Sequence, residues 1–273
     1  MHSIAPAASP RSVPSWAAPS AVRRTTRRIT RTSLLVAEAM STRLHPKVAQ
    51  DTAIERAGQL RWVAENLCAL HGVQVVAHGA SIPAGPCALV ANHISYLDPV
   101  ALISQIAATA IAKREVSTWP LLGATMDALG VLWVDRGCAA SGARVLRAVA
   151  RSWEAGVPVL AFPEGTTTRG DDVLPFRRGL FGMALAEGVP VVPVTLVYDD
   201  PSVPWVDGQA FVPHYVRTAA RPCTRASLYF EPAIQPDGED AEGLAEKARA
   251  VIRARLEARS VASRADLALR HLP

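Results

Sequence analysis

Short apolar runs alternate with amphipathic stretches over most of the chain, from about residue 48 to residue 258. Apolar runs bounded by turn-forming residues are typical of buried strands, and apolar residues at three- and four-residue steps are typical of helices. The expected strands are residues 73–76, 87–91, 110–113, 132–134, 158–162, 191–198 and 226–230. The expected helices are residues 48–71, 99–108, 120–129, 141–155, 179–187 and 240–258. This alternation predicts an α/β fold with a largely parallel mixed sheet flanked by helices.

The segments outside the alternation differ in composition. Residues 1–47 hold eight Lys and Arg residues and one acid, Glu38, so their charge is +7 while the whole chain carries only +5. We therefore expect a basic, disordered arm at 1–46, a folded domain at 47–260 and a polar C-terminal tail at 261–273. An Arg- and Ser-rich start also fits a transit peptide, a contact with anionic lipid headgroups, or a later start at Met40.

Two further segments bear on membrane contact and on the loops. The expected helix at 48–71 could pack against the core, or lie in a membrane interface with Trp62 at headgroup depth. No run approaches the ~18 apolar residues that span a bilayer, so we expect peripheral binding at the cytoplasmic face of a membrane and no transmembrane segment. Residues 199–223 are rich in Pro and polar groups and are expected to form a long loop. The four cysteines are far apart, and no metal-binding or nucleic-acid-binding motif is present.

The first candidate site is the turn that follows the expected strand at 87–91. It contains His93 and, five residues later, Asp98, which precedes Pro99. Asp before Pro predicts a helix start with Asp98 as its N-cap. An imidazole on such a turn could take a proton from an alcohol while a nearby carboxylate fixes its tautomer. Taken alone, the two residues are more simply explained as a helix cap and a hydrogen-bonded surface histidine.

A second polar turn, residues 162–170, also follows an apolar strand, so the two turns are expected to share one site. The first turn resembles the Asn-His-x-x-x-x-Asp signature of the glycerolipid acyltransferases, the group that includes lysophosphatidate acyltransferase. The second resembles the Phe-Pro-Glu-Gly-Thr block of that family. Residues 130–136 and 189–194 resemble two further blocks in the family's order. The ordered set covers roughly residues 87–198.

The resemblance implies a glycerolphosphate-acyltransferase-like fold and a lipid-modifying reaction. A fatty acyl group would pass from acyl-CoA or acyl-carrier protein to a lysophospholipid hydroxyl, first of all that of 1-acyl-sn-glycerol-3-phosphate. It implies His93 as the general base and Asp98 as its orienting carboxylate, with no metal and no cofactor beyond the co-substrate. The implied substrate-binding residues are Asn92, Arg136, Glu164, Gly165, Thr166 and Arg169. Arginine suits this role because its fork matches phosphate.

One position departs from the family pattern. The usual block has Arg directly after its first Thr, and here that residue is Thr167. The altered block resembles members that acylate lyso-ornithine lipids, so that acceptor stays open. A hydrolase that uses His93 to activate water and a non-enzymatic lipid-binding protein also stay open. Asn92 could brace its turn or donate to an oxyanion, and Arg178 lies where many members have a basic residue.

Overall fold

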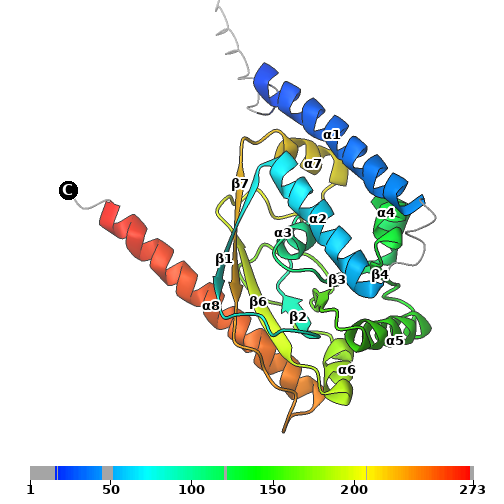
Figure 1. Cartoon of the computed structure of the whole chain (residues 1–273). Coiled ribbons are helices and arrows are strands. Elements are labelled where there is room, and N and C mark those ends of the chain that lie inside the picture. Colours follow the sequence, from blue (N-terminus) through cyan, green and yellow to red (C-terminus); the bar gives the residue numbers. More distant parts are fainter. Residues whose placement is uncertain (1–15, 17, 45–51, 120–121, 207, 271–273) are drawn as a thin grey trace, which may run out of the picture.

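The computed structural model describes residues 16, 18–44, 52–119, 122–206 and 208–270. Within these residues seven strands form one sheet in the order β1-β7-β6-β2-β5-β3-β4 (Figure 1). The strands are β1 (Val73–Gly79), β2 (Ala88–Ala91), β3 (Thr109–Lys113), β4 (Leu132–Val134), β5 (Val159–Ala161), β6 (Val191–Tyr198) and β7 (Thr224–Phe230). Neighbouring strands are parallel except for β6 and β7, which are antiparallel. The predicted α/β fold with a largely parallel mixed sheet is confirmed.

Helices pack on both faces of this sheet (Figure 1). One face is covered by α2 (Ala53–His71) and α3 (Asp98–Ile103). The other face is covered by α5 (Ala139–Glu154), α6 (Gly179–Glu187) and α8 (Ala241–Arg270). A 3-10 helix, η2 (Arg114–Thr118), and α4 (Leu122–Ala128) connect β3 to β4, while α7 (Phe211–Ala219) connects β6 to β7. Within the described part of the chain no helix is both long enough and apolar enough to cross a membrane.

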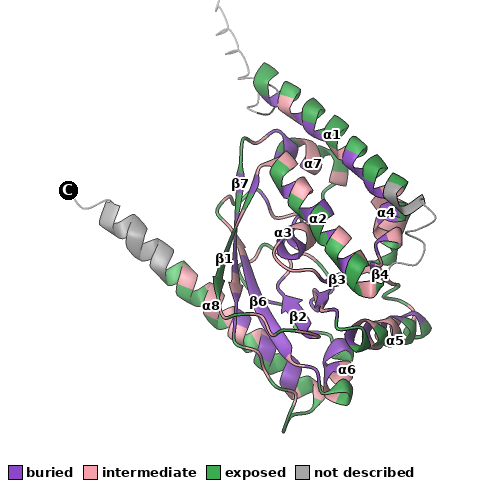
Figure 2. Ribbon diagram, in the orientation of Figure 1, coloured by how far each residue is buried: buried purple, intermediate pink, exposed green. Residues whose placement is uncertain are grey.

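The central strand β2 is buried on both faces (Figure 2). Leu89 belongs to the core that contains Leu60 of α2, and Val90 belongs to the core that contains Val149 of α5. Successive side chains of a strand point to opposite faces, so a strand between two helical layers is a continuous apolar run. The residues that follow β2 therefore leave the sheet from a rigid, fully buried position.

The structure differs from the sequence-based expectation at the N-terminus, because residues 19–44 of the expected disordered arm form α1 (Pro19–Leu44). This helix contacts α2, α4 and α7 (Figure 1). The buried side chain of Arg28 donates to the carbonyls of Leu70 at 2.9 Å and Ala219 at 2.9 Å. Those carbonyls lie at the C-terminal ends of α2 and α7, where a helix leaves acceptors without intrahelical partners. Arg28, one of the charged residues that led us to expect disorder, thus makes internal contacts in the folded domain.

Several element boundaries also differ from the expected ones. The expected loop at 199–223 contains α7, whose Pro213 lies in the first turn, where a missing N–H costs nothing. Helix α2 begins at Ala53 rather than at residue 48 because Thr52 and Glu55 form a capping box. At the other end, α8 continues to Arg270 through most of the expected polar tail. The expected helix start at residue 120 lies outside the described residues.

Candidate active site

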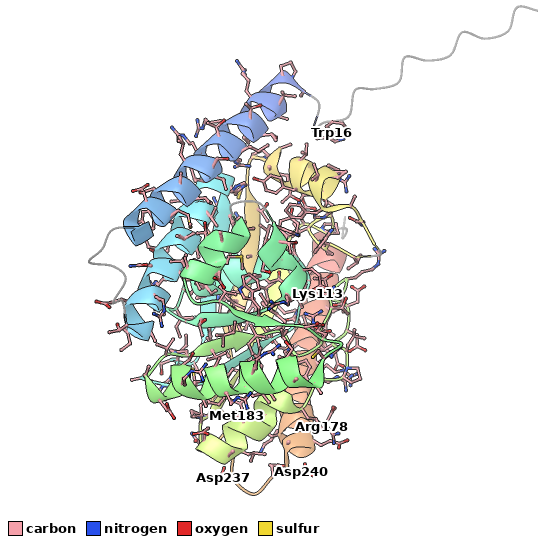
Figure 3. All side chains as sticks on the ribbon, turned by 90° about the vertical axis from the view of Figure 1, so that its right-hand side faces the viewer. Trp16, Lys113, Arg178, Met183, Asp237 and Asp240 are labelled. Carbon is pink, nitrogen blue, oxygen red and sulfur yellow. The ribbon has the colours of Figure 1, made fainter. Side chains whose placement is uncertain are left out.

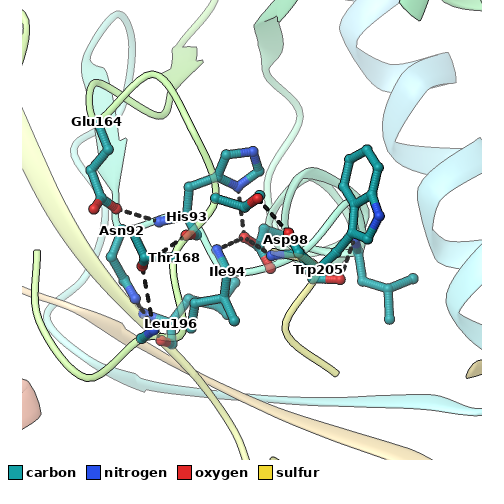
Figure 4. A network of polar contacts seen from close by, with 12 residues as sticks. Asn92, His93, Ile94, Asp98, Glu164, Thr168, Leu196 and Trp205 are labelled. Carbon is teal, nitrogen blue, oxygen red and sulfur yellow. Dashed lines mark hydrogen bonds and ion pairs between the residues drawn. The ribbon is translucent and has the colours of Figure 1, made fainter. Parts of the chain in front are cut away.

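The turn after β2 brings the two expected catalytic side chains together (Figure 4). Nδ1 of His93 lies 2.8 Å from Oδ2 of Asp98. Asp98 is not the N-cap that the sequence predicted, because Leu97 occupies that position and no side chain caps α3. The Asp98 carboxylate instead points back to the turn that carries His93. The helix start therefore places the carboxylate without using it as a cap.

The Asp98 carboxylate is fully buried and accepts hydrogen bonds from the turn and from β6. The N–H of Ile94 donates to Oδ2 at 2.6 Å and the N–H of Ser95 at 2.9 Å. The hydroxyl of Tyr198 donates to Oδ1 at 2.9 Å. With these donors around it the carboxylate acts as an acceptor, so Nδ1 of His93 carries the shared proton. The lone pair of the neutral imidazole is then on Nε2, which can accept a proton.

Tyr198 is a site residue that the sequence reading missed. It ends β6 and lies 100 positions from Asp98 in the sequence. Burial raises the pKa of Tyr198 well above its usual value, and the adjacent Asp98 carboxylate adds to this shift. The hydroxyl therefore remains a donor. Its signal is its place at the end of a buried strand, which becomes informative once β6 is known to pair with β2.

Phe162 is the second residue that was missed, although it lies in the second polar turn. Its ring stacks on the imidazole of His93 with centroids 4.2 Å apart and planes 21° apart. Phe162 directly follows β5, which pairs with β2 in parallel. The imidazole is therefore held between a ring on one face and a hydrogen bond at Nδ1, so both its orientation and its tautomer are set.

Asn92 and Glu164, predicted to bind substrate, both make hydrogen bonds to backbone groups in the structure, as the alternative of a bracing role for Asn92 predicted. The Asn92 amide is fully buried, donating to the carbonyl of Leu196 at 3.0 Å and accepting its N–H at 2.8 Å. Glu164 accepts the N–H of His93 at 2.7 Å and the N–H of Leu174 at 2.8 Å. Burial raises the pKa of Glu164, whereas the two backbone donors oppose that shift. Asn92 thus ties the end of β2 to β6, and Glu164 ties the first polar turn to the segment that follows the second.

Gly165 is the meeting point of two arginines. The guanidinium of Arg136 donates to the Gly165 carbonyl, and a Cβ at this glycine would lie 2.6 Å from Nε of Arg177. Burial lowers the pKa of Arg136, and the charge of Arg177 lowers it further. A glycine is required here because φ is +78° and because the arginine side chain lies against it. Two neighbouring cations one residue beyond Glu164 form a place where an anion would be stabilised.

The remaining expected residues, Thr166 and Arg169, lie on the second polar turn. Arg169 lines a cavity of about 350 Å³. Other residues that line it include Ile94, Asp171, Tyr198, Asp199 and Asp200. Thr166 is exposed on the second turn. Arg178, which lies where many family members have a basic residue, pairs with Glu242 at 2.9 Å beside the start of α8 (Figure 3).

The geometry permits one kind of chemistry in particular. A hydroxyl placed at Nε2 of His93 would lose its proton to the imidazole, and Asp98 would stabilise the imidazolium that forms. The cationic pair at Gly165 could bind an anionic group. Within the described residues no group of three His, Cys, Asp or Glu side chains could hold a metal ion.

Comparison with known proteins gives a consistent picture. Residues 73–197 match the family model described as Acyltransferase. The chain is 37% identical over 150 residues to the lyso-ornithine lipid O-acyltransferase of Pseudomonas aeruginosa, covering 55% of this chain and 57% of that protein. It is 32% identical over 148 residues to the human 1-acyl-sn-glycerol-3-phosphate acyltransferase alpha, covering 52% of each. The chain thus spans about half the length of these curated relatives.

The fold has a counterpart among solved structures. The 1-acyl-sn-glycerophosphate acyltransferase PlsC from Thermotoga maritima superposes with a TM-score of 0.66 at 20% identity. The superposition covers 88% of this chain and 95% of that one. This likeness shows the shared fold, and the matched region and the curated relatives support a relationship to the glycerolipid acyltransferases.

Proposed function

We propose that the chain transfers a fatty acyl group from acyl-CoA or acyl-carrier protein to the free hydroxyl of a lysophospholipid, with 1-acyl-sn-glycerol-3-phosphate as the leading acceptor. The observation that carries the proposal is the contact of 2.8 Å between His93 Nδ1 and Asp98 Oδ2 at the end of β2. It lies within residues 73–197, which match the acyltransferase family. The relatives named for this activity support the same reaction class.

The proposed mechanism is direct attack. Nε2 of His93 removes the proton from the acceptor hydroxyl while the oxygen forms a bond to the thioester carbonyl carbon. The carbon–sulfur bond then breaks, and the imidazolium returns the proton to the leaving thiolate. Asp98 and Phe162 keep the imidazole oriented throughout. Beyond its two substrates the reaction requires no cofactor.

The acceptor phosphate has a proposed binding place at Gly165. Arg136 was expected there from the sequence, and Arg177 joins it in the structure. Glu164, the preceding residue, accepts the N–H of His93, so this anion site adjoins the catalytic turn. A phosphate at the cationic pair and a hydroxyl at Nε2 would belong to one glycerol backbone. Arg169 lines the neighbouring cavity and is not needed for this arrangement.

A lyso-ornithine lipid is the second candidate acceptor. Thr167 replaces the arginine that the family block usually has, and a lyso-ornithine lipid O-acyltransferase is among the similar relatives. A hydrolase is less well supported because two cations at Gly165 have no role in attack by water. A lipid-binding protein without activity would not need an oriented His93.

Membrane contact through α1 is part of the proposal. The exposed side of this helix carries Val22, Ile29 and Leu34 together with Arg23, Arg27 and Arg31. Apolar and cationic residues on one exposed helix side fit the interface of an anionic membrane. We place the chain on the cytoplasmic face of a membrane, where anionic headgroups and acyl donors meet.

The deciding experiment offers lysophosphatidate and lyso-ornithine lipid side by side to the purified chain. Labelled acyl-CoA and labelled acyl-carrier protein serve as donors, and the products are separated and counted. Transfer to lysophosphatidate, lost in Arg136→Gln and Arg177→Gln, supports the phosphate assignment. Transfer to the ornithine lipid alone would reject that assignment, and release of free fatty acid without transfer would favour the hydrolase.

A further inference from the structure

The connection between β6 and α7 is fastened to both polar turns of the site at Trp205. The N–H of Trp205 donates to the carbonyl of Ile94 at 2.9 Å. The carbonyl of Trp205 accepts the hydroxyl of Thr167. The next residue, Thr168, donates its N–H to the carbonyl of His93 at 2.7 Å. The backbone of Trp205 is therefore held by one hydrogen bond to each polar turn. In the first turn its partner is Ile94, the residue next to His93.

The indole of Trp205 joins a group of rings that we call the aromatic cluster, namely Tyr96, Trp119, Trp205 and Phe211. The centroid of Trp205 lies 5.8 Å from that of Tyr96 and 6.0 Å from that of Phe211. Phe211 packs in turn on Trp119 at 4.3 Å. All four residues are only partly buried, so the cluster presents aromatic surface to the outside. Figure 4 shows the indole of Trp205 and the imidazole of His93 extending to the same side of the turn.

The aromatic cluster is also held in place by His214 of α7. His214 of α7 is buried, with Nδ1 3.2 Å from the hydroxyl of Tyr96 and Nε2 3.2 Å from the carbonyl of Pro204. Val203 and Val206, on either side of the Trp205 segment, are buried as well. The segment 203–206 is therefore anchored in the fold beside the catalytic turn.

A lysolipid acceptor has two requirements that this arrangement meets. Its hydroxyl must reach Nε2 of His93, and the apolar part next to the glycerol must follow a surface away from the polar turn. Partly exposed aromatic rings offer a large, stiff apolar area at small entropic cost. The Thr167 hydroxyl holds the backbone of Trp205, whereas a charged residue at that place would address the headgroup.

We propose that Thr167 is a positioning residue, whose hydroxyl fixes Trp205 so that the aromatic cluster forms the wall along which the lysolipid acceptor lies at His93. This inference rests on the proposed acyl transfer and adds to it the side from which the acceptor binds. Thr167 acts through Trp205, and it does not touch the reacting atoms. The residue that departs from the family pattern thus sets acceptor recognition through main-chain contact.

The test compares Thr167→Val with Thr167→Ser in the full chain. Valine keeps the shape but loses the hydroxyl, and we expect the acceptor KM to rise about three- to tenfold, the effect of one lost hydrogen bond. The donor KM and the pH profile of kcat should stay unchanged, and serine should restore the acceptor KM. Trp205→Ala should raise the acceptor KM further, with Trp205→Phe in between.

Thr195→Val is the matched control. Thr195 is buried on β6 and its hydroxyl has no partner in the described structure, so this change should leave the acceptor KM unaltered. Thermal unfolding of each variant separates a loss of folding from a loss of binding. An unchanged acceptor KM in Thr167→Val, or an equal rise for acceptor and donor, overturns the inference. A wild-type chain that acylates no lysolipid rejects the proposed function, and the inference with it.

Discussion

At the residue scale, Asp98 is the group on which the site depends. Its carboxylate holds the His93 imidazole, two N–H groups of the turn and the Tyr198 hydroxyl. A buried carboxylate is stable in such a place because both of its oxygens accept hydrogen bonds. The Asp98 carboxylate also sets the tautomer of His93. One side chain therefore both holds the turn and orients the imidazole.

Replacing His93 by Ala tests the general-base role directly. We expect acyl transfer to fall about a hundred- to ten-thousandfold, the usual contribution of a positioned base. Folding should be retained because the side chain is partly exposed and Asp98 keeps its backbone donors. Transfer is measured with saturating donor, and circular dichroism follows folding. Residual activity above about one per cent of wild type would contradict the assignment.

Tyr198→Phe tests whether the second donor to Asp98 matters. The phenylalanine fills the same volume but leaves Oδ1 of a fully buried carboxylate without this donor. We expect the free energy of unfolding to fall by about 1 to 3 kcal/mol, as for other unsatisfied buried groups. The rate should fall less than in His93→Ala because Nδ1 keeps its acceptor. Urea unfolding measures the first effect, and an unchanged midpoint would show that the contact is unimportant.

At the scale of elements, α1 is joined to the domain through Arg28. Its guanidinium reaches carbonyls at the ends of both α2 and α7. Arg28→Gln should leave these carbonyls without a donor. We expect the free energy of unfolding to fall by about 2 to 4 kcal/mol. Arg27→Gln is the matched control because Arg27 is exposed on the same helix. Limited trypsin digestion should release α1 in the first variant sooner than in the second, and equal rates would contradict this role.

His71, at the end of α2, makes the α1 contact sensitive to pH. Burial, with a smaller contribution from the Arg28 charge, lowers its pKa to about 4. Its Nε2 lies 3.0 Å from the Thr32 hydroxyl and 3.4 Å from that of Tyr215. Below pH ~6.5 the unfolded chain binds a proton at this residue that the folded chain does not bind until about pH 4. Stability should therefore fall as the pH drops from about 6.5 to 4, by at most about 3 kcal/mol.

The measurement is the urea midpoint between pH 7.5 and pH 5 for the wild type and His71→Gln. Other groups titrate in this range too, so the informative quantity is the difference between the two slopes. A wild-type slope no steeper than that of His71→Gln would mean that His71 has the same pKa in the folded and the unfolded chain.

The elements that the sequence predicted well are those with a single strong period. β2 and β5 are continuous apolar runs and β6 is mostly apolar. The two polar turns follow β2 and β5, so the general position of the candidate site could be predicted. Tyr198 and Arg177 could not, because their roles depend on which strands pair and on the path of a turn. α1 was missed because its stabilising contact is a buried arginine, which a count of charges assigns to solvent.

At the scale of the whole molecule, the sheet separates two helical layers with different surroundings. The layer of α2 and α3 is further covered by α1, whose outer side mixes apolar and basic residues. The layer of α5, α6 and α8 carries exposed arginines on α5 at positions 144, 147 and 151. Cationic residues therefore occur on both sides, but exposed large apolar residues accompany them on α1.

This asymmetry predicts which side meets a membrane. Replacing Arg23, Arg27 and Arg31 by glutamine in one triple variant should weaken binding to anionic vesicles roughly a hundredfold. Each cation near such a surface contributes about 1 kcal/mol. The same change at Arg144, Arg147 and Arg151 on α5 removes equal charge from the other side and should have a small effect. Vesicle sedimentation at low and at physiological salt measures both, because electrostatic attraction is screened as salt rises. If the two triple variants lose binding equally, net charge alone attracts the chain; if only the α1 variant loses it, α1 faces the lipid.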